Sequence, residues 1–110
     1  MIIKFNPIAT GFNPDLNVTV RDCQPRYQGL KIGDTIVLSD LGPMVLGYGI
    51  VERIYHGPMK HIPKSFLKVE HSPACRTLRG LKKTMTHVYG QCFHMHRTVT
   101  AIMFTYREKV

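Results

Sequence analysis

The sequence is short of acidic residues: its 110 residues include seven Asp or Glu against fifteen Lys or Arg, a formal net charge of +8 at pH 7. It has only three cysteines, at long spacings, so a disulfide-stabilised scaffold is not expected. No apolar run approaches the roughly 18 residues of a membrane-spanning helix, and the first residues lack the order of a signal peptide. These absences predict a soluble, cytoplasmic protein with no membrane partner.

The hydrophobic content of 44% is that of a globular protein. Neither a repeat nor a low-complexity linker interrupts the chain, so we expect one domain over residues 1–110.

The shortage of acids is concentrated in one third of the chain. Residues 1–59 carry five basic and five acidic side chains, whereas residues 60–97 carry eight Lys or Arg and one acid, Glu70. A surface of one sign concentrates polyanions and releases their counterions on contact. Nucleic acid is therefore the expected partner.

Alternating and β-branched apolar residues predict strands at 1–5, 18–22, 35–38, 44–55 and 99–106, separated by turns rich in Asn, Pro and Gly. Gly47 and Gly49 inside the fourth strand predict a bulge or a sharp bend. Ser72 and Pro73 predict the start of a helix that ends at Gly90. A second, short helix is expected at 63–69. Many short strands with one or two helices favour a small α+β barrel of five or six strands.

The expected long helix has an apolar stripe and a basic remainder. Leu78, Leu81, Met85 and Val88 recur at helical spacing, and Arg76, Arg79, Lys82 and Lys83 fall mostly off that stripe. Such a charge run is commonly a solvated helix face. The absence of interleaved acids favours contact with a polyanion instead.

Three motifs occur in a fixed order: TVRD at 19–22, KIGD at 31–34 and LRGLKKTMTHVYG at 78–90, followed by the last strand. With these motifs the sequence resembles the ASCH family of small PUA-like β-barrels over residues 16–106. It is most similar to the short bacterial members that hydrolyse N4-acetylcytidine. The resemblance implies a cleft between barrel and helix that receives a nucleobase or nucleoside.

The resemblance also assigns roles to particular positions. Thr19 matches the threonine proposed as nucleophile, and Arg21 matches the arginine of the motif. The family's activating lysine and catalytic glutamate are replaced by Leu16 and Ala74, and Glu70 lies one helical turn before Ala74. A threonine hydroxyl needs a base to take its proton, so these replacements disfavour hydrolysis.

We therefore expect a noncatalytic module that binds nucleic acid, RNA in preference to DNA, or a nucleotide, without a cofactor. The residues expected to contact phosphates are Arg21, Arg76, Arg79, Lys82 and Lys83. Thr19 and Tyr89 would line a base-sized cleft. Two alternatives stay open: an amidohydrolase on acylated cytidine-like nucleosides with Thr19 as nucleophile, and a small regulatory protein whose basic face docks an acidic protein.

Cys92, His94 and His96 alternate along the chain and would share one face of a strand, as zinc ligands sometimes do. No Cys-x-x-Cys pair accompanies them. The alternative interpretation, a buried cysteine with surface histidines, is preferred, and no metal site is predicted.

Overall fold

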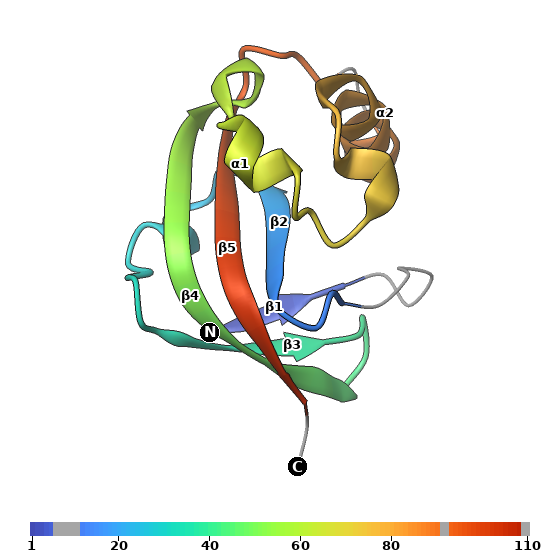
Figure 1. Ribbon diagram of the computed structural model, residues 1–110. Coiled ribbons are helices and arrows are strands. Elements are labelled where there is room, and N and C mark those ends of the chain that lie inside the picture. Colours follow the sequence, from blue (N-terminus) through green and yellow to red (C-terminus); the bar gives the residue numbers. More distant parts are fainter. Residues whose placement is uncertain (6–11, 91–92, 109–110) are drawn as a thin grey trace.

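Five β-strands form the body of the protein in a computed structural model, which describes residues 1–5, 12–90 and 93–108 (Figure 1). The strands are β1 (Ile2–Lys4), β2 (Leu16–Asp22), β3 (Thr35–Ser39), β4 (Val45–Pro58) and β5 (Thr98–Glu108). They form one sheet in the order β1-β3-β4-β5-β2. The sheet curls into a half-barrel that carries two helices, so the expectation of a small α+β, PUA-like barrel is confirmed.

The long strands β4 and β5 are the centre of this sheet. β5 pairs antiparallel with both β4 and β2, and β1 pairs parallel with β3. In the β2–β5 register Thr19 lies opposite Ile102, and Arg21 lies opposite Thr100. A strand presents alternate residues on the same face, so Thr19 and Arg21 are presented together.

The bend expected at the β4 glycines is present. Leu38 pairs with Gly47 while Ser39 pairs with Val45, so β4 has an extra residue there, and a second register shift lies between Val51 and Arg53. At Gly49 a side chain would be 2.8 Å from the Phe104 ring, since β5 passes close by. These bulges bend β4 and curl the sheet around its core.

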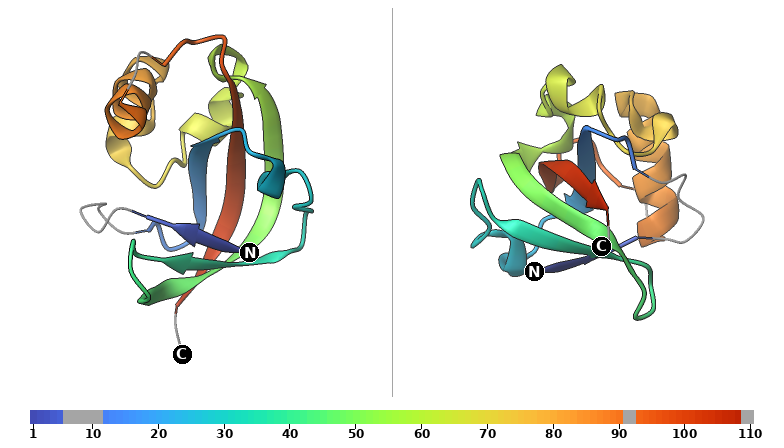
Figure 2. Two further views of the ribbon diagram at one scale, coloured as in Figure 1. Left: turned by 180° about the vertical axis from the view of Figure 1, so that it is seen from behind. Right: turned by 60° about the horizontal axis from the view of Figure 1, so that its bottom comes forward.

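Most of the helices lie at one end of the sheet (Figure 2), namely η2 (Met59–His61), α1 (Lys64–Leu67), η3 (Pro73–Cys75) and α2 (Leu78–Tyr89). The short η1 (Pro25–Tyr27), which follows β2, lies apart from them. The expected cap at Ser72 is wrong: Ser72 precedes only the short η3, and Thr77 caps α2 by accepting from the Gly80 N–H at 3.1 Å. Gly90 ends α2 with φ of +69°, as predicted. None of the described helices is long and apolar enough to cross a membrane.

The buried apolar side chains form two clusters. One lies between the helices and the sheet and includes Phe66, Leu81 and Phe93. The other lies inside the curl of the sheet and includes Tyr27, Ile36 and Phe104. Of the predicted α2 stripe, Leu81 and Met85 are buried, but Val88 is 62% exposed.

Candidate functional site

A cavity of about 670 Å³ lies where the half-barrel is not closed, between β1, β2 and α2. It is built from segments far apart in the sequence: the end of β1, the middle of β2, the β3–β4 turn, the 70–75 loop and one side of α2. Its lining includes Lys4, Phe5, Thr19, Arg21, Leu41, Glu70, His71, Cys75, Thr84, Met85, His87, Val88 and Tyr89. Apolar walls with a few convergent polar groups are typical of a small-molecule or base-binding site.

Thr19 and Arg21 of β2 form the floor of this cavity. Thr19 is buried, and its hydroxyl accepts a hydrogen bond from Arg21 Nε at 2.9 Å. The Arg21 guanidinium stacks over the Phe5 ring, with Cζ 4.6 Å from the ring centroid. Within the described ranges no acceptor bonds its two Nη groups. Guanidinium N–H groups of this kind suit a ligand such as a phosphate or a base edge.

The Arg21 guanidinium is largely buried, so its positive charge is poorly hydrated. Burial lowers the pKa of its guanidinium, and the neighbouring Tyr27, Tyr89 and Glu70 act in the opposite direction. A guanidinium starts from so high a pKa that it stays charged. A partly dehydrated cation gains more from a ligand anion or carbonyl than an exposed one does.

Glu70 and His71 close the side of the cavity that faces the 70–75 loop. The backbone on either side of Glu70 pairs with Val18 of β2, through Val18 N to Val69 O at 2.9 Å and His71 N to Val18 O at 3.1 Å. The Glu70 side chain is 2% exposed, and its Oε1 accepts from Ser72 N at 3.0 Å and lies 2.7 Å from His71 Nδ1. His71 Nδ1 also lies 3.1 Å from the Val18 carbonyl. Because both neighbours are acceptors, Nδ1 carries the proton.

Tyr89 and Cys75 complete the part of the wall below α2. The Tyr89 hydroxyl accepts from the Asp22 N–H at 3.1 Å, and its ring lies 5.6 Å from the Phe93 ring. The hydrogen bond between Tyr89 and Asp22 ties the end of α2 to β2. Burial raises the pKa of the Cys75 thiol, so the thiol stays protonated and is a poor nucleophile.

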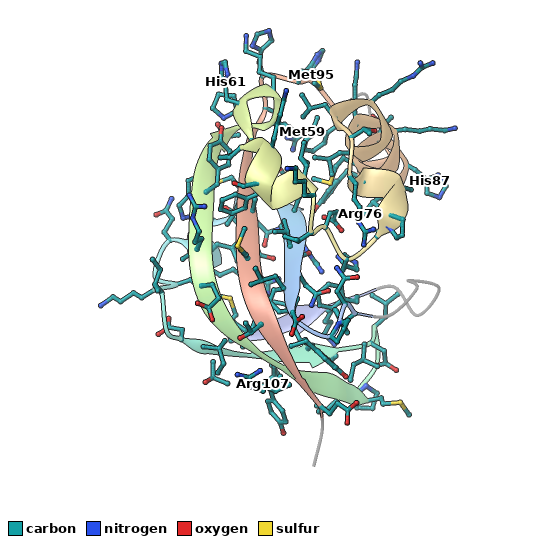
Figure 3. The ribbon with its side chains drawn as sticks, in the orientation of Figure 1. Met59, His61, Arg76, His87, Met95 and Arg107 are labelled. Carbon is teal, nitrogen blue, oxygen red and sulfur yellow. The ribbon has the colours of Figure 1, made fainter. Side chains whose placement is uncertain are left out.

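The basic segment gathers at the end of the molecule that carries the helices (Figure 1). Its eight cations are all exposed, and its one acid, Glu70, is buried. We call these cations the basic end: Lys60, Lys64, Lys68, Arg76, Arg79, Lys82, Lys83 and Arg97. Figure 3 shows His61 and Met95 at this end and Arg76 and His87 beside α2. Within the described part of the chain, Arg97 alone of the eight has an acidic partner, Asp22, at 2.6 Å.

The sequence-predicted site residues fall into two groups. Thr19, Arg21 and Tyr89 meet in the cavity, whereas Arg76, Arg79, Lys82 and Lys83 do not line it. Arg76 bonds the Glu70 carbonyl at 3.0 Å through Nε and Asn13 Oδ1 at 3.2 Å through Nη2, and so fixes the 70–75 loop.

The α2 lysines flank the helix face that lines the cavity. At about 100° per residue, Lys82 and Lys83 lie roughly 120° and 140° around α2 from Val88, in the middle of that face. Lys82 is only about 20° from Tyr89, and Lys83 about 40° from His87, at the two edges of the face.

Several cavity residues were not predicted from the sequence, above all Lys4, Phe5, Leu41, His71 and His87. Lys4 and Phe5 belong to β1 and its end, and Leu41 belongs to the β3–β4 turn. Neither segment has a sequence pattern that indicates a binding site. Ala74 is exposed and Leu16 packs against the apolar cluster under the helices, so neither replaced position supplies an ionisable group.

A second, smaller cavity of about 400 Å³ is lined by Met1, Arg26, Leu30 and Asp34 among others. Its polar groups already bond within the protein: Arg26 donates to Ile2 O and the Tyr27 hydroxyl, and Asp34 accepts from Lys31 N.

Of the histidine motif, His94 and His96 are exposed, and Cys92 lies outside the described residues. The described residues contain no group of three His, Cys, Asp or Glu side chains placed to hold a metal ion.

Comparison of the sequence with protein-family models gives no match, and comparison with curated proteins gives none. The fold is similar to the crystal structure of protein EF3133 from Enterococcus faecalis V583, which carries the family description DUF984, with a TM-score of 0.55 and 17% identity. The match covers 86% of this chain and 62% of that protein, so the chain spans less than two thirds of its length. At this identity the likeness concerns the fold alone.

Proposed function

We propose that this chain is a noncatalytic module that binds RNA, in preference to DNA, or a nucleotide. One base occupies the cavity against Thr19, Arg21 and Glu70, and phosphates lie along the basic end. The observation that carries the proposal is the meeting of these three side chains in one cavity beside a surface segment whose exposed charges are all positive. The guanidinium offers hydrogen-bond donors and the carboxylate an acceptor, which together match the polar edge of a base.

The basic end gives the first prediction. Each phosphate contact to a single strand contributes about 0.7 to the slope of log affinity against log salt. Replacing Lys82 and Lys83 by glutamine should therefore reduce that slope by about 1.4 for a single-stranded RNA oligonucleotide. Fluorescence anisotropy across a salt series, with matched RNA and DNA strands, measures the slope.

The matched control is Lys31→Gln, because Lys31 is equally exposed but lies in the η1–β3 loop, away from α2. This control should leave the slope unchanged. No binding at low salt, or binding that is indifferent to salt, would contradict the proposal. Capture of an acidic protein that survives nuclease treatment, without RNA binding, would favour the docking alternative.

A second function, hydrolysis of an acylated nucleoside, is favoured by one observation: a buried carboxylate, Glu70, lines the same cavity as Thr19. In such a reaction Thr19 Oγ1 attacks the acyl carbon, its proton passes to a base, and the amine leaves with that proton; water then cleaves the acyl-threonine ester and releases the carboxylic acid. In the described residues, however, the hydrogen-bond partner of this hydroxyl is the cation Arg21 and not a base. Glu70 Oε1 is already engaged by Ser72 and His71. The arrangement thus favours binding.

We accordingly expect the purified protein and its Thr19→Ala and Glu70→Gln variants to leave N4-acetylcytidine equally intact. The reason is that no base within hydrogen-bonding distance activates Thr19 among the described residues. Chromatographic assay of cytidine release measures this. Release by the wild-type protein that disappears in both variants would establish the hydrolase instead.

A further inference from the structure

Two aliphatic side chains at the mouth of the cavity are exposed to solvent. Leu41 of the β3–β4 turn is 61% exposed and Val88 of α2 is 62% exposed, yet both belong to the cavity wall. We call this pair the aliphatic rim. An apolar surface left in water beside a polar site is typical of a surface that a ligand covers.

Leu41 is held in its exposed position by the turn that carries it. Asp40 Oδ1 accepts from Gly42 N at 2.8 Å and from Met44 N at 3.1 Å, and Asp40 N donates to Met44 O at 3.0 Å. Lys4 Nζ donates to the Leu41 carbonyl at 3.4 Å. The turn is therefore tied both to itself and to β1, and it presents Leu41 to the cavity mouth without a hydrophobic partner for most of the side chain.

The polar groups at the same mouth indicate what would cover the rim. The Lys4 ammonium and the His87 imidazole line the cavity together with Leu41 and Val88, and both residues are exposed. A cationic group beside an aliphatic surface complements a flat ring joined to a phosphate. Within a nucleic acid, that is the nucleotide adjoining the one in the cavity.

We propose that the aliphatic rim packs on the base next to the inserted one, so that the ligand is a strand of at least two nucleotides. This inference rests on the proposed function. A mononucleotide leaves Leu41 and Val88 in water, whereas a dinucleotide covers them and places its linking phosphate beside Lys4 and His87. The basic end, whose α2 lysines flank the helix face that lines the cavity, then contacts phosphates further along the strand.

The test compares nucleoside 5′-monophosphates with the matched ribodinucleotides, for all four bases, by calorimetric titration. The wild-type protein should bind the dinucleotides more tightly. Burying part of one aliphatic side chain contributes about fivefold in affinity, so Leu41→Ser with Val88→Ser should weaken dinucleotide binding by roughly 25-fold. Mononucleotide binding should change less than about twofold, because a mononucleotide does not reach the rim.

Met44→Ser is the matched control. Met44 belongs to the same turn and is 62% exposed, but it does not line the cavity. Its replacement should leave both ligands bound as before. Equal dinucleotide affinity in the wild type and the rim variant overturns the inference while leaving Arg21-dependent mononucleotide binding, and the proposed function, in place. Absence of binding by either ligand overturns both.

Discussion

Arg21→Met is expected to weaken nucleotide or RNA binding by about 100-fold, since loss of one partner of a buried charge-assisted contact typically costs 2–5 kcal/mol. Methionine keeps an apolar side chain against Phe5, which Arg21 now covers at 4.6 Å, but removes the donors aimed at the ligand. It also releases the Thr19 hydroxyl from its bond to Arg21 Nε. Titration of wild type and variant with the same oligonucleotide at one salt concentration measures the effect.

Arg26→Met is the matched control for this substitution. Arg26 also stacks on an aromatic ring, with Cζ 4.8 Å from the centroid of Tyr27, but it does not line the cavity of Arg21. The control should therefore bind as the wild type does. A loss of affinity that is the same for both arginines would indicate a general effect of net charge and would remove Arg21 from the site.

Gly80→Ala is expected to destabilise the fold by about 3 kcal/mol, the upper part of the range for overpacking. In an exposed helix this substitution usually stabilises by about 1 kcal/mol. Here a Cβ on Gly80 would lie 1.9 Å from the Ala74 carbonyl oxygen, so α2 and η3 must move apart. Urea denaturation followed by circular dichroism measures the change, which corresponds to a fall in Tm of roughly 13 °C.

Gly29→Ala is the control for the glycine substitution. A Cβ at Gly29 meets nothing within 4 Å, and its φ is not positive. Its replacement should leave the free energy of unfolding unchanged or slightly increased, because alanine restricts the unfolded chain. A stabilising effect of Gly80→Ala would show that η3 does not pack against α2 as described. Since Cys75 of η3 and Leu81 of α2 line the cavity, Gly80→Ala should also weaken ligand binding.

Several element boundaries differ from those predicted from local sequence patterns. The alternation predicted at 18–22 is extended to Leu16–Asp22, and the strand predicted at 44–55 continues to Pro58. Both extensions pair with β5, and such pairing depends on the partner strand, which a local pattern does not include. The start of α2 was placed too early because Ser72-Pro73 is a valid helix start by itself, whereas Thr77 is the residue whose hydroxyl bonds the α2 backbone.

Val88 shows why the site was harder to predict than the fold. Its helical spacing with Leu81 and Met85 predicts burial, yet it is 62% exposed and belongs to the cavity wall. Helical periodicity gives the direction in which a side chain points. It does not say whether that direction meets protein or a cavity.

The sequence by itself determined the class of fold, the order of its strands and helices along the chain, the segment that carries the excess positive charge, and three residues of the cavity, Thr19, Arg21 and Tyr89. The fold class, the order of the elements and the basic segment follow from periodicity, turn residues and composition, whereas the three cavity residues were implied by the family resemblance that the ordered motifs carry. Only the tertiary structure decided that Lys4, Leu41, Glu70 and His71 join them, and that the lysines of α2 do not line the cavity. Those placements depend on the curl of the sheet, which brings β1, a turn and a loop together across long sequence separations.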